Sequence, residues 1–140
     1  MTNKETKKFL QSFIDGDRLR RYVVLDIVDG AESGCYEGNL EERLRAKLQD
    51  VSNGGQNGSI ASLTYYHETL AFFKKFKKEI IALVQNTARE LGQTSGAFLS
   101  DLRGWDNDDP FCKDTTNRQL LAWFAYEEIA YRLSMELENI

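Results

Sequence analysis

The sequence has few of the residues that interrupt helices. Pro110 is the one proline among 140 residues, which favours long uninterrupted helices over a loop-rich or collagen-like chain. No run of about 18 apolar residues occurs, and no apolar stretch follows the charged N-terminus, so neither a transmembrane helix nor a signal peptide is expected. We therefore expect a small soluble protein in the cytoplasm, with no membrane partner.

The residues that build metal and nucleotide sites are also scarce. Cys35 and Cys112 are isolated from each other, and His67 is the single histidine. A structural zinc site needs about four such ligands, so it cannot be assembled, and reduced thiols are the simplest interpretation. The sequence has neither a GxxxxGK[ST] loop nor a GxGxxG turn. No cofactor is therefore predicted.

Charge is distributed unevenly along the chain. The total of −4 argues against a generally basic nucleic-acid binder but leaves a local basic patch open. Residues 1–21 have six basic and three acidic side chains, a net +3, whereas residues 101–114 have two basic and five acidic ones, a net −3. The small total thus conceals a basic start and an acidic segment.

The spacing of apolar residues predicts helices in the first third of the chain. Thr2 followed by Glu5 fits a capping box for a first helix, and a second helix is expected over about 19–28. The glycine-containing stretch 29–39 is interpreted as a loop. Asn39 at its end is a good N-cap for a third helix, which is expected from residue 40 to about residue 50, with Lys47 on its solvent side.

Two long helices are expected in the rest of the chain. Apolar spacings of three and four predict them over about 60–91 and 115–137. The first would be roughly 48 Å long at 1.5 Å per residue, so a break near Lys74–Lys78 is expected. Gly92 lies where a C-terminal glycine cap belongs. The prediction is an all-α single domain over 1–140, a compact bundle of about five to six helices.

Lysine and phenylalanine alternate in the middle of the first long helix. Such interleaving can mark a nucleic-acid surface. On a helix, however, the phenylalanines gather on one side and much of the lysine charge on the other, which is the ordinary pattern of an amphipathic helix. The residues concerned are Phe72, Phe73 and Phe76 with Lys74, Lys75, Lys77 and Lys78.

A short helix around 97–102 is expected to precede an acidic loop over 104–110. The acidic spacing is similar to a calcium loop, but the glycine and terminal glutamate of that motif are missing, so calcium is not expected. Acidic clusters can occupy a basic groove on another protein. We therefore predict protein-binding residues here, namely Trp105, Asp106, Asp108 and Asp109.

Histidine and two glutamates are the residues that could support catalysis. His67 and Glu68 point to different sides of a helix, so a metal site would need carboxylates from another helix. Glu127 follows a nearly all-apolar stretch and is expected at the edge of the core, where a carboxylate needs hydrogen-bond partners. Glu128 has Arg132 four residues later and is expected to form a surface ion pair. We assign no catalytic or metal-binding residue.

Two blocks of sequence stand out in the second half of the chain. The first contains Gly54, Gly55, Gly58, Tyr65, Tyr66, His67, Glu68 and Thr69, and the second contains Trp123, Glu127 and Glu128. Together they resemble a family of small uncharacterised proteins encoded by bacteriophages, prophages and plasmids, which pairs a Gly-rich turn and a YYxDT-like helix with a terminal LAWFAFEE-like helix. The resemblance covers about 51–137. It implies a mobile element in a bacterial host cell and a mostly helical fold, and it implies no activity.

Three functions stay open on the sequence. The leading one is a non-enzymatic accessory protein of a mobile element that binds a host bacterial protein, with an inhibitor of a defence system such as an anti-CRISPR as its most concrete version. The alternatives are a nucleic-acid-associated accessory or regulatory protein, which would use the lysines, and a small metal-dependent enzyme, which would use His67, Glu68 and Glu127. The oligomeric state is open, and a dimer through the aromatic-rich terminal helix is one option.

Overall fold

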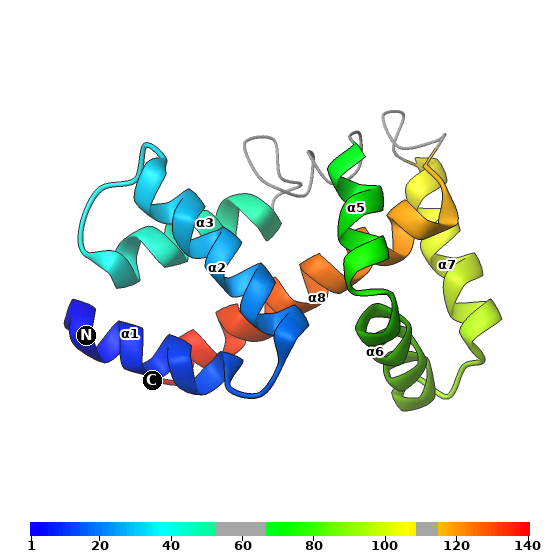
Figure 1. Cartoon of the computed structure of the whole chain (residues 1–140), viewed down its shortest axis with the longest axis horizontal. Helices are drawn as coiled ribbons and strands as arrows, with labels where there is room; N and C mark the ends of the chain where they lie inside the picture. The colour runs from blue at the N-terminus through cyan, green and yellow to red at the C-terminus, as the bar shows by residue number, and fades with distance from the viewer. Residues whose placement is uncertain (53–66, 109–114) are drawn as a thin grey trace. The chain divides into compact units, whose positions relative to one another are not determined.

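The fold is all-α throughout the part of the chain that the structure describes. The computed structural model describes residues 1–52, 67–108 and 115–140, with the side chains of residues 52, 67 and 105–108 left out. No strand occurs in these ranges, which confirms the predicted fold class, and none of the helices in them could cross a membrane. The seven described helices are α1 (Asn3–Ile14), α2 (Arg18–Ser33), α3 (Leu40–Ser52), α5 (His67–Lys75), α6 (Lys77–Glu90), α7 (Ser95–Asp108) and α8 (Asn117–Glu138) (Figure 1).

The helices belong to two units. Unit 1 combines Met1–Ala61 with Glu127–Ile140, and unit 2 is Ser62–Tyr126. The chain passes from unit 2 to unit 1 within α8, so the first half of this helix belongs to unit 2 and the second half to unit 1. The single domain over 1–140 stays a prediction.

Unit 1 is built around an aliphatic core. α2 packs along α3, and α1 packs against both. Full burial of each Leu, Ile or Val side chain contributes about 1.5–3 kcal/mol, so this core is the main source of the unit's stability. It consists of Leu10, Ile14, Leu19, Val23, Val24, Ile27, Ala31, Leu40, Leu44, Leu48, Val51, Ile129, Ala130, Leu133 and Leu137.

Both N-caps expected in this unit are present. The Thr2 hydroxyl accepts a hydrogen bond from the Glu5 backbone N–H, and the Glu5 carboxylate accepts one from the Thr2 backbone N–H. Asn39 and Glu42 exchange the same two kinds of bond at the start of α3. These bonds satisfy donors that a helix leaves free in its first turn, which is why the sequence pattern locates the helix starts well.

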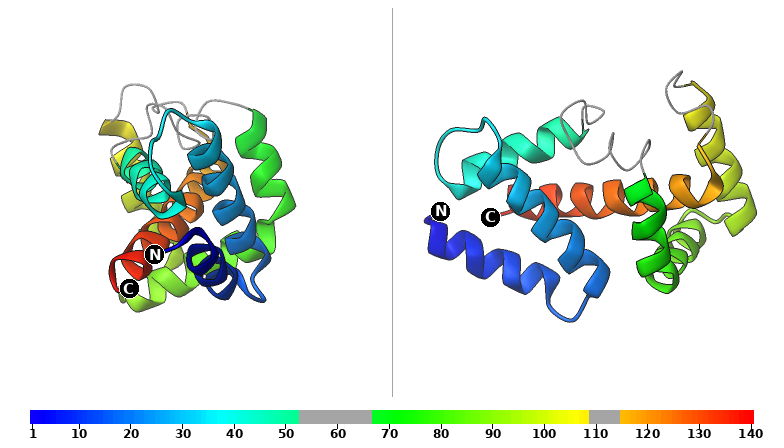
Figure 2. Two further views of the ribbon diagram at one scale, coloured as in Figure 1. Left: turned by 90° about the vertical axis from the view of Figure 1, so that its left-hand side faces the viewer. Right: turned by 45° about the horizontal axis from the view of Figure 1, so that its top comes forward.

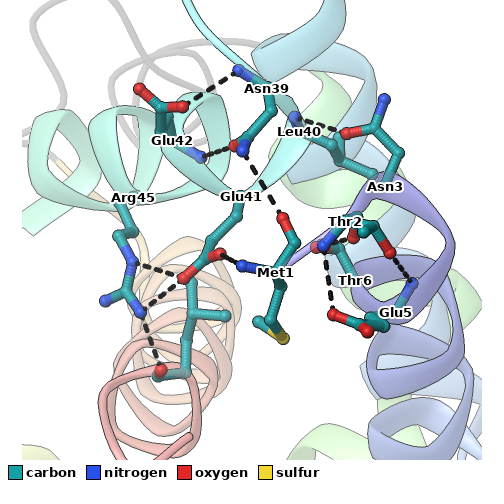
Figure 3. A network of polar contacts seen from close by, with 11 residues as sticks. Met1, Thr2, Asn3, Glu5, Thr6, Asn39, Leu40, Glu41, Glu42 and Arg45 are labelled. Atoms are coloured by element: carbon teal, nitrogen blue, oxygen red, sulfur yellow. Dashed lines mark hydrogen bonds and ion pairs between the residues drawn. The ribbon is translucent and has the colours of Figure 1, made fainter.

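The two ends of the chain meet within unit 1. The Met1 amine lies 2.9 Å from Oε2 of Glu41 (Figure 3). Arg45 Nη2 donates to Oε1 of Glu41 and to the Leu137 carbonyl, both at 2.9 Å. The N- and C-termini accordingly lie close together in each view (Figure 2). α3 thus holds both the start of α1 and the end of α8.

Two expectations for unit 1 are wrong. Residues 29–33 continue α2 instead of beginning a loop, and Lys47 is only 5% exposed instead of lying on the solvent side. A Cβ atom at Gly30 would lie 2.8 Å from Cε of Lys47. Because Gly30 has no Cβ, the lysine methylenes can lie against the backbone of α2.

Unit 2 is built from α5, α6, α7 and the first half of α8. α6 packs against α7, and α5 contacts α6. The rings of Phe98 and Phe124 meet edge to face with their centroids 4.9 Å apart. The buried core consists of Phe72, Phe73, Phe76, Ile80, Val84, Ala88, Phe98, Leu102, Leu120, Ala122, Ala125 and Tyr126.

The predicted helix over 60–91 is two helices where it is described. α5 ends at Lys75 and α6 begins at Lys77, so the helix is interrupted at Phe76, within the stretch where a break is expected. The Phe76 ring is buried with its centroid 5.6 Å from that of Phe72. The break therefore places an aromatic side chain in the core. Residues 60–66 lie outside the described residues.

α6 ends as the sequence predicts. Gly92 has a φ of +70°, and its N–H donates to the Arg89 carbonyl. The Gln93 N–H donates to the Ala88 carbonyl at 2.8 Å. This pair of bonds is a Schellman motif, which satisfies carbonyls that the last turn would otherwise leave free.

α7 is longer than expected, whereas α8 agrees with its prediction. The prediction of a loop from residue 104 is wrong up to residue 108, because α7 runs to Asp108. Asp and Asn lower helix propensity by only fractions of a kcal/mol each, whereas Pro110 is the residue that opposes a helix strongly. α8 begins after Thr116, which caps it together with Gln119.

Candidate functional site

An open groove lies in unit 1 between α1, the first turn of α2 and the last turns of α8. Phe9 and Phe13 stand four residues apart on α1, so they share one face. Arg132, Met135 and Glu136 share a face of α8 for the same reason. The groove has a volume of about 420 Å³ and is lined by Phe9, Ser12, Phe13, Arg20, Arg132, Met135 and Glu136.

Arg20 is held against the aromatic wall of this groove. Its Nη1 donates to the Phe13 carbonyl at 3.0 Å, and its guanidinium carbon lies 4.7 Å from the centroid of the Phe13 ring, a cation–π distance. Its Nε lies 3.9 Å from Oδ2 of Asp17. Within the described ranges Nη2 has no partner, so Arg20 combines a fixed orientation with an available donor.

Arg132 lines the groove from α8. Its Nε donates to Oε1 of Glu128 at 2.9 Å, which confirms the ion pair predicted from the sequence. Its two terminal nitrogens have no partner among the residues that the structure describes. Glu136 is the one acidic residue in the lining, so two arginines and one glutamate leave it with a net charge of +1.

Exposed apolar surface continues from the groove along α8. Met135 is 43% exposed, and Tyr131, one turn earlier on the same helix, is 57% exposed. Single exposed apolar residues are normal on protein surfaces. Here, however, two of them adjoin a groove with aromatic and arginine side chains, which is the composition of protein interfaces.

The predicted basic patch lies on the solvent side of α5 and α6. Buried phenylalanine rings cannot stack on nucleic-acid bases, so the amphipathic interpretation of this segment is confirmed. Lys75 Nζ lies 5.4 Å from the centroid of the Phe76 ring. The exposed residues are Lys74, Lys75, Lys77 and Lys78, and the buried ones are Phe72, Phe73 and Phe76.

Glu127 lies at the edge of the core, as the sequence predicts. Its side chain is half-buried, and this burial, followed by the negative charge of Glu128, raises the pKa of Glu127. In the described part of the chain no hydrogen bond to its carboxylate occurs, so the expected polar partners are not found there. Glu127 therefore carries its charge at a cost to stability.

The remaining candidate metal ligands belong to different parts of the chain. His67 begins α5 with its side chain outside the described residues, Glu68 is exposed in unit 2, and Glu127 belongs to unit 1. Within the ranges that the structure describes, no group of three or more His, Cys, Asp or Glu side chains could hold a metal ion. The metal-dependent enzyme stays a prediction.

Two described residues that carry the family resemblance have buried polar atoms without a hydrogen-bond partner in the described ranges. Thr69 is fully buried, yet its Oγ1 has no hydrogen-bond partner among the described residues, and the same holds for the buried Nε1 of Trp123. An unpaired buried polar atom costs roughly 1–3 kcal/mol. Nothing in the structure explains these two atoms. The residues Gly54, Gly55, Gly58, Tyr65 and Tyr66 lie outside the described residues.

The predicted protein-binding residues are only partly described. Trp105, Asp106 and Asp108 belong to α7, but their side chains are among those left out. Asp109 lies outside the described residues. Their role as a contact surface stays a prediction.

Sequence reasoning missed the groove. It joins residues from opposite ends of the chain, so no local pattern marks it. The two signals available were the spacing of Phe9 and Phe13 and the ion-pair spacing of Glu128 and Arg132.

The comparisons with known proteins identify a family. The family described as a domain of unknown function (DUF7222) matches residues 16–139. This span is wider than the 51–137 of the resemblance, and it includes Arg20, Arg132 and Met135 of the groove. No curated protein and no solved structure matches the chain. Because the match covers most of its length, the chain belongs to the DUF7222 family.

Proposed function

We propose that this protein acts without catalysis by binding another protein, and that the groove of unit 1 together with the exposed side of α8 is the contact surface. The observation that carries the proposal is the exposure of Met135 and Tyr131 beside two arginines with available donors. Arginine and tyrosine are enriched among residues that dominate binding energy, and methionine is enriched at interfaces.

A finer form of the proposal concerns the partner. A host bacterial protein is the expected partner if the chain is an accessory protein of a mobile element. An inhibitor of a bacterial defence system, such as an anti-CRISPR, is the most concrete version. The support for this form is the resemblance of the two sequence blocks to phage, prophage and plasmid proteins.

A matched pair of surface variants tests the contact surface. Met135→Glu places a charge in the groove, and Leu25→Glu places the same charge at an exposed leucine of α2 that does not line it. We expect wild type and the Leu25 variant to capture one bacterial protein that the Met135 variant loses. Equal capture by all three baits would show that the groove is not the surface. No capture from several bacterial lysates would count against protein binding itself.

The exposed lysines favour a second candidate function, which is binding to the nucleic-acid backbone. With the phenylalanines buried, such binding would depend on phosphate contacts alone and would weaken steeply with salt. Replacing Lys74, Lys75, Lys77 and Lys78 by glutamate should then abolish it. Unchanged binding to DNA and RNA by that variant would exclude this candidate.

A further inference from the structure

We propose that the partner enters the groove with an acidic segment, which presents a carboxylate to Arg20 and Arg132 and an adjacent apolar side chain to the aromatic wall. The inference rests on the proposed function, because it names the chemistry of the partner at the same surface. It commits to a protein segment that carries Asp or Glu beside Leu, Ile or Phe.

Each of the two guanidinium groups uses only some of its donors within the described part of the chain. Arg20 uses Nη1 for the Phe13 carbonyl, and Arg132 uses Nε for Glu128. Nη2 of Arg20 and both terminal nitrogens of Arg132 have no partner among the described residues. The planar arrangement of guanidinium donors matches the two oxygens of a carboxylate. Because Arg20 is already ordered by its contacts with Phe13, binding there loses less side-chain entropy.

Basic side chains outnumber acidic ones around the groove. Residues 1–21, which include Arg20 and its partner Asp17, have a net charge of +3. Arg132 with its partner Glu128 and the lining residue Glu136 contribute a net −1, which leaves +2. Lys4, Lys7 and Lys8 of α1 are all exposed. A positive field of this kind attracts an acidic segment and repels a basic one. Glu136 in the lining opposes a segment that carries many carboxylates and no apolar residue.

The apolar surface of the groove favours a protein segment over a simple anion. Phe9 and Phe13 are half-buried, and Met135 is exposed. A phosphate group would leave this surface wet, whereas a leucine or phenylalanine side chain beside a carboxylate would cover it, which is favourable at about 25 cal/mol per Å². The groove is bounded by about one turn of each helix, so one apolar side chain and one carboxylate a turn apart suit its size.

The chain offers a direct reporter of occupancy. It has two methionines, Met1 and Met135, and only Met135 lines the groove. Protein labelled with ¹³C at the methionine methyl groups therefore gives one signal from the groove and one internal reference. The probe is an end-blocked peptide of three Glu-Glu-Leu-Leu repeats. The comparison peptides are its Gln-Gln-Leu-Leu and Glu-Glu-Ser-Ser counterparts, and inorganic phosphate is the anion control.

We expect the Glu-Glu-Leu-Leu peptide to shift the Met135 signal and leave that of Met1 in place. Both comparison peptides should bind at least about fivefold more weakly, because each lacks one of the two contacts. Arg20→Gln and Arg132→Gln should each weaken binding by a similar factor. Arg21→Gln removes the same charge from an exposed neighbour that does not line the groove, and it should stay within about twofold of wild type.

Several results would overturn the inference. They are equal binding of the Gln-Gln-Leu-Leu peptide, an equal Met135 shift with phosphate, a Met1 shift alone, or no peptide binding. A Met135 shift that depends on protein concentration without peptide would assign the groove to a second copy of this chain. The peptide comparison uses wild-type protein, so it holds even if an arginine variant is unstable. If the peptides fail while a captured partner still requires Met135, the acidic chemistry is wrong and the proposed function stands.

Discussion

At the scale of the residue, Glu127 links burial to pH-dependent stability. Burial raises its pKa, so the folded state binds the proton more tightly than the unfolded state does. The resulting stabilisation is present below the unfolded pKa of 4.5 and is lost as pH rises through the folded pKa. We expect Glu127→Gln to be at least as stable as wild type at neutral pH and to remove this pH dependence.

Urea unfolding between about pH 4 and pH 8 measures this effect through the free energy of unfolding. Glu138→Gln, at an exposed position of the same helix, is the control and should keep the wild-type profile. A Glu127→Gln variant that is clearly less stable at neutral pH would show that the carboxylate makes a favourable contact with residues outside the described ranges.

Tyr36 predicts a change of stability with pH in the alkaline range. Burial, followed by its hydrogen bond to Asp50, raises the pKa of Tyr36 to about 12. The stabilisation is therefore fully present below the ordinary pKa of 10 and is lost as pH rises through about 12. Tyr36→Phe should cost about 1 kcal/mol at neutral pH, because Asp50 loses a half-exposed partner.

The measurement for Tyr36 is the denaturant midpoint of wild type and Tyr36→Phe at increasing pH. The difference between the two proteins should be constant up to about pH 10 and should shrink above it. Tyr131→Phe, at an exposed tyrosine of α8, is the matched control. A difference that grows with pH would contradict the assigned cause.

At the scale of the element, two glycines predict stability changes of opposite sign. Gly92 has a φ of +70° and Gly96 lies in the first turn of α7, and a Cβ at either position would meet nothing within 4 Å. Only backbone conformation therefore decides the effect. Gly92→Ala should cost about 1–2 kcal/mol because the left-handed conformation is strained for alanine, whereas Gly96→Ala should stabilise by up to about 1 kcal/mol. Thermal unfolding of both variants tests this, and changes of the same sign would contradict it.

The elements also show how far the sequence predicts the fold. Helix starts at Thr2 and Asn39 and the end at Gly92 follow from bonds between near neighbours, so local patterns suffice. The burial of Lys47 depends instead on the missing Cβ of Gly30 in another helix, which only the packed structure reveals. Errors of prediction therefore occur where one helix adapts to another.

The candidate site is predictable from the sequence only in part. The Glu128–Arg132 pair is predictable because its members are one turn apart. The sequence does not predict that Arg132, Arg20 and Phe13 line one groove, because the groove forms only when three helices pack together. Spacing rules therefore do not predict a groove made by distant segments, even where each segment is predicted correctly.

At the scale of the whole molecule, unit 1 depends on both ends of the chain. Its core takes Leu133 and Leu137 from α8, and both side chains are almost completely buried. Arg45 binds the Leu137 carbonyl, which adds a polar contact to the same junction. Folding of this unit therefore requires closure of a long loop, which slows folding relative to local helix pairing.

A fragment experiment tests this dependence. Residues 1–61 alone lack the α8 contribution to the core, so we expect low helicity and no cooperative thermal transition. Joining 127–140 to this fragment through a Gly-Ser linker should restore a cooperative transition, because the buried leucines return. Leu133→Ala in the joined protein is the control, and it should cost about 2–5 kcal/mol because it leaves a cavity. A fragment 1–61 that melts cooperatively near the midpoint of the full chain would show that α1, α2 and α3 form a sufficient core and that α8 is held mainly by unit 2.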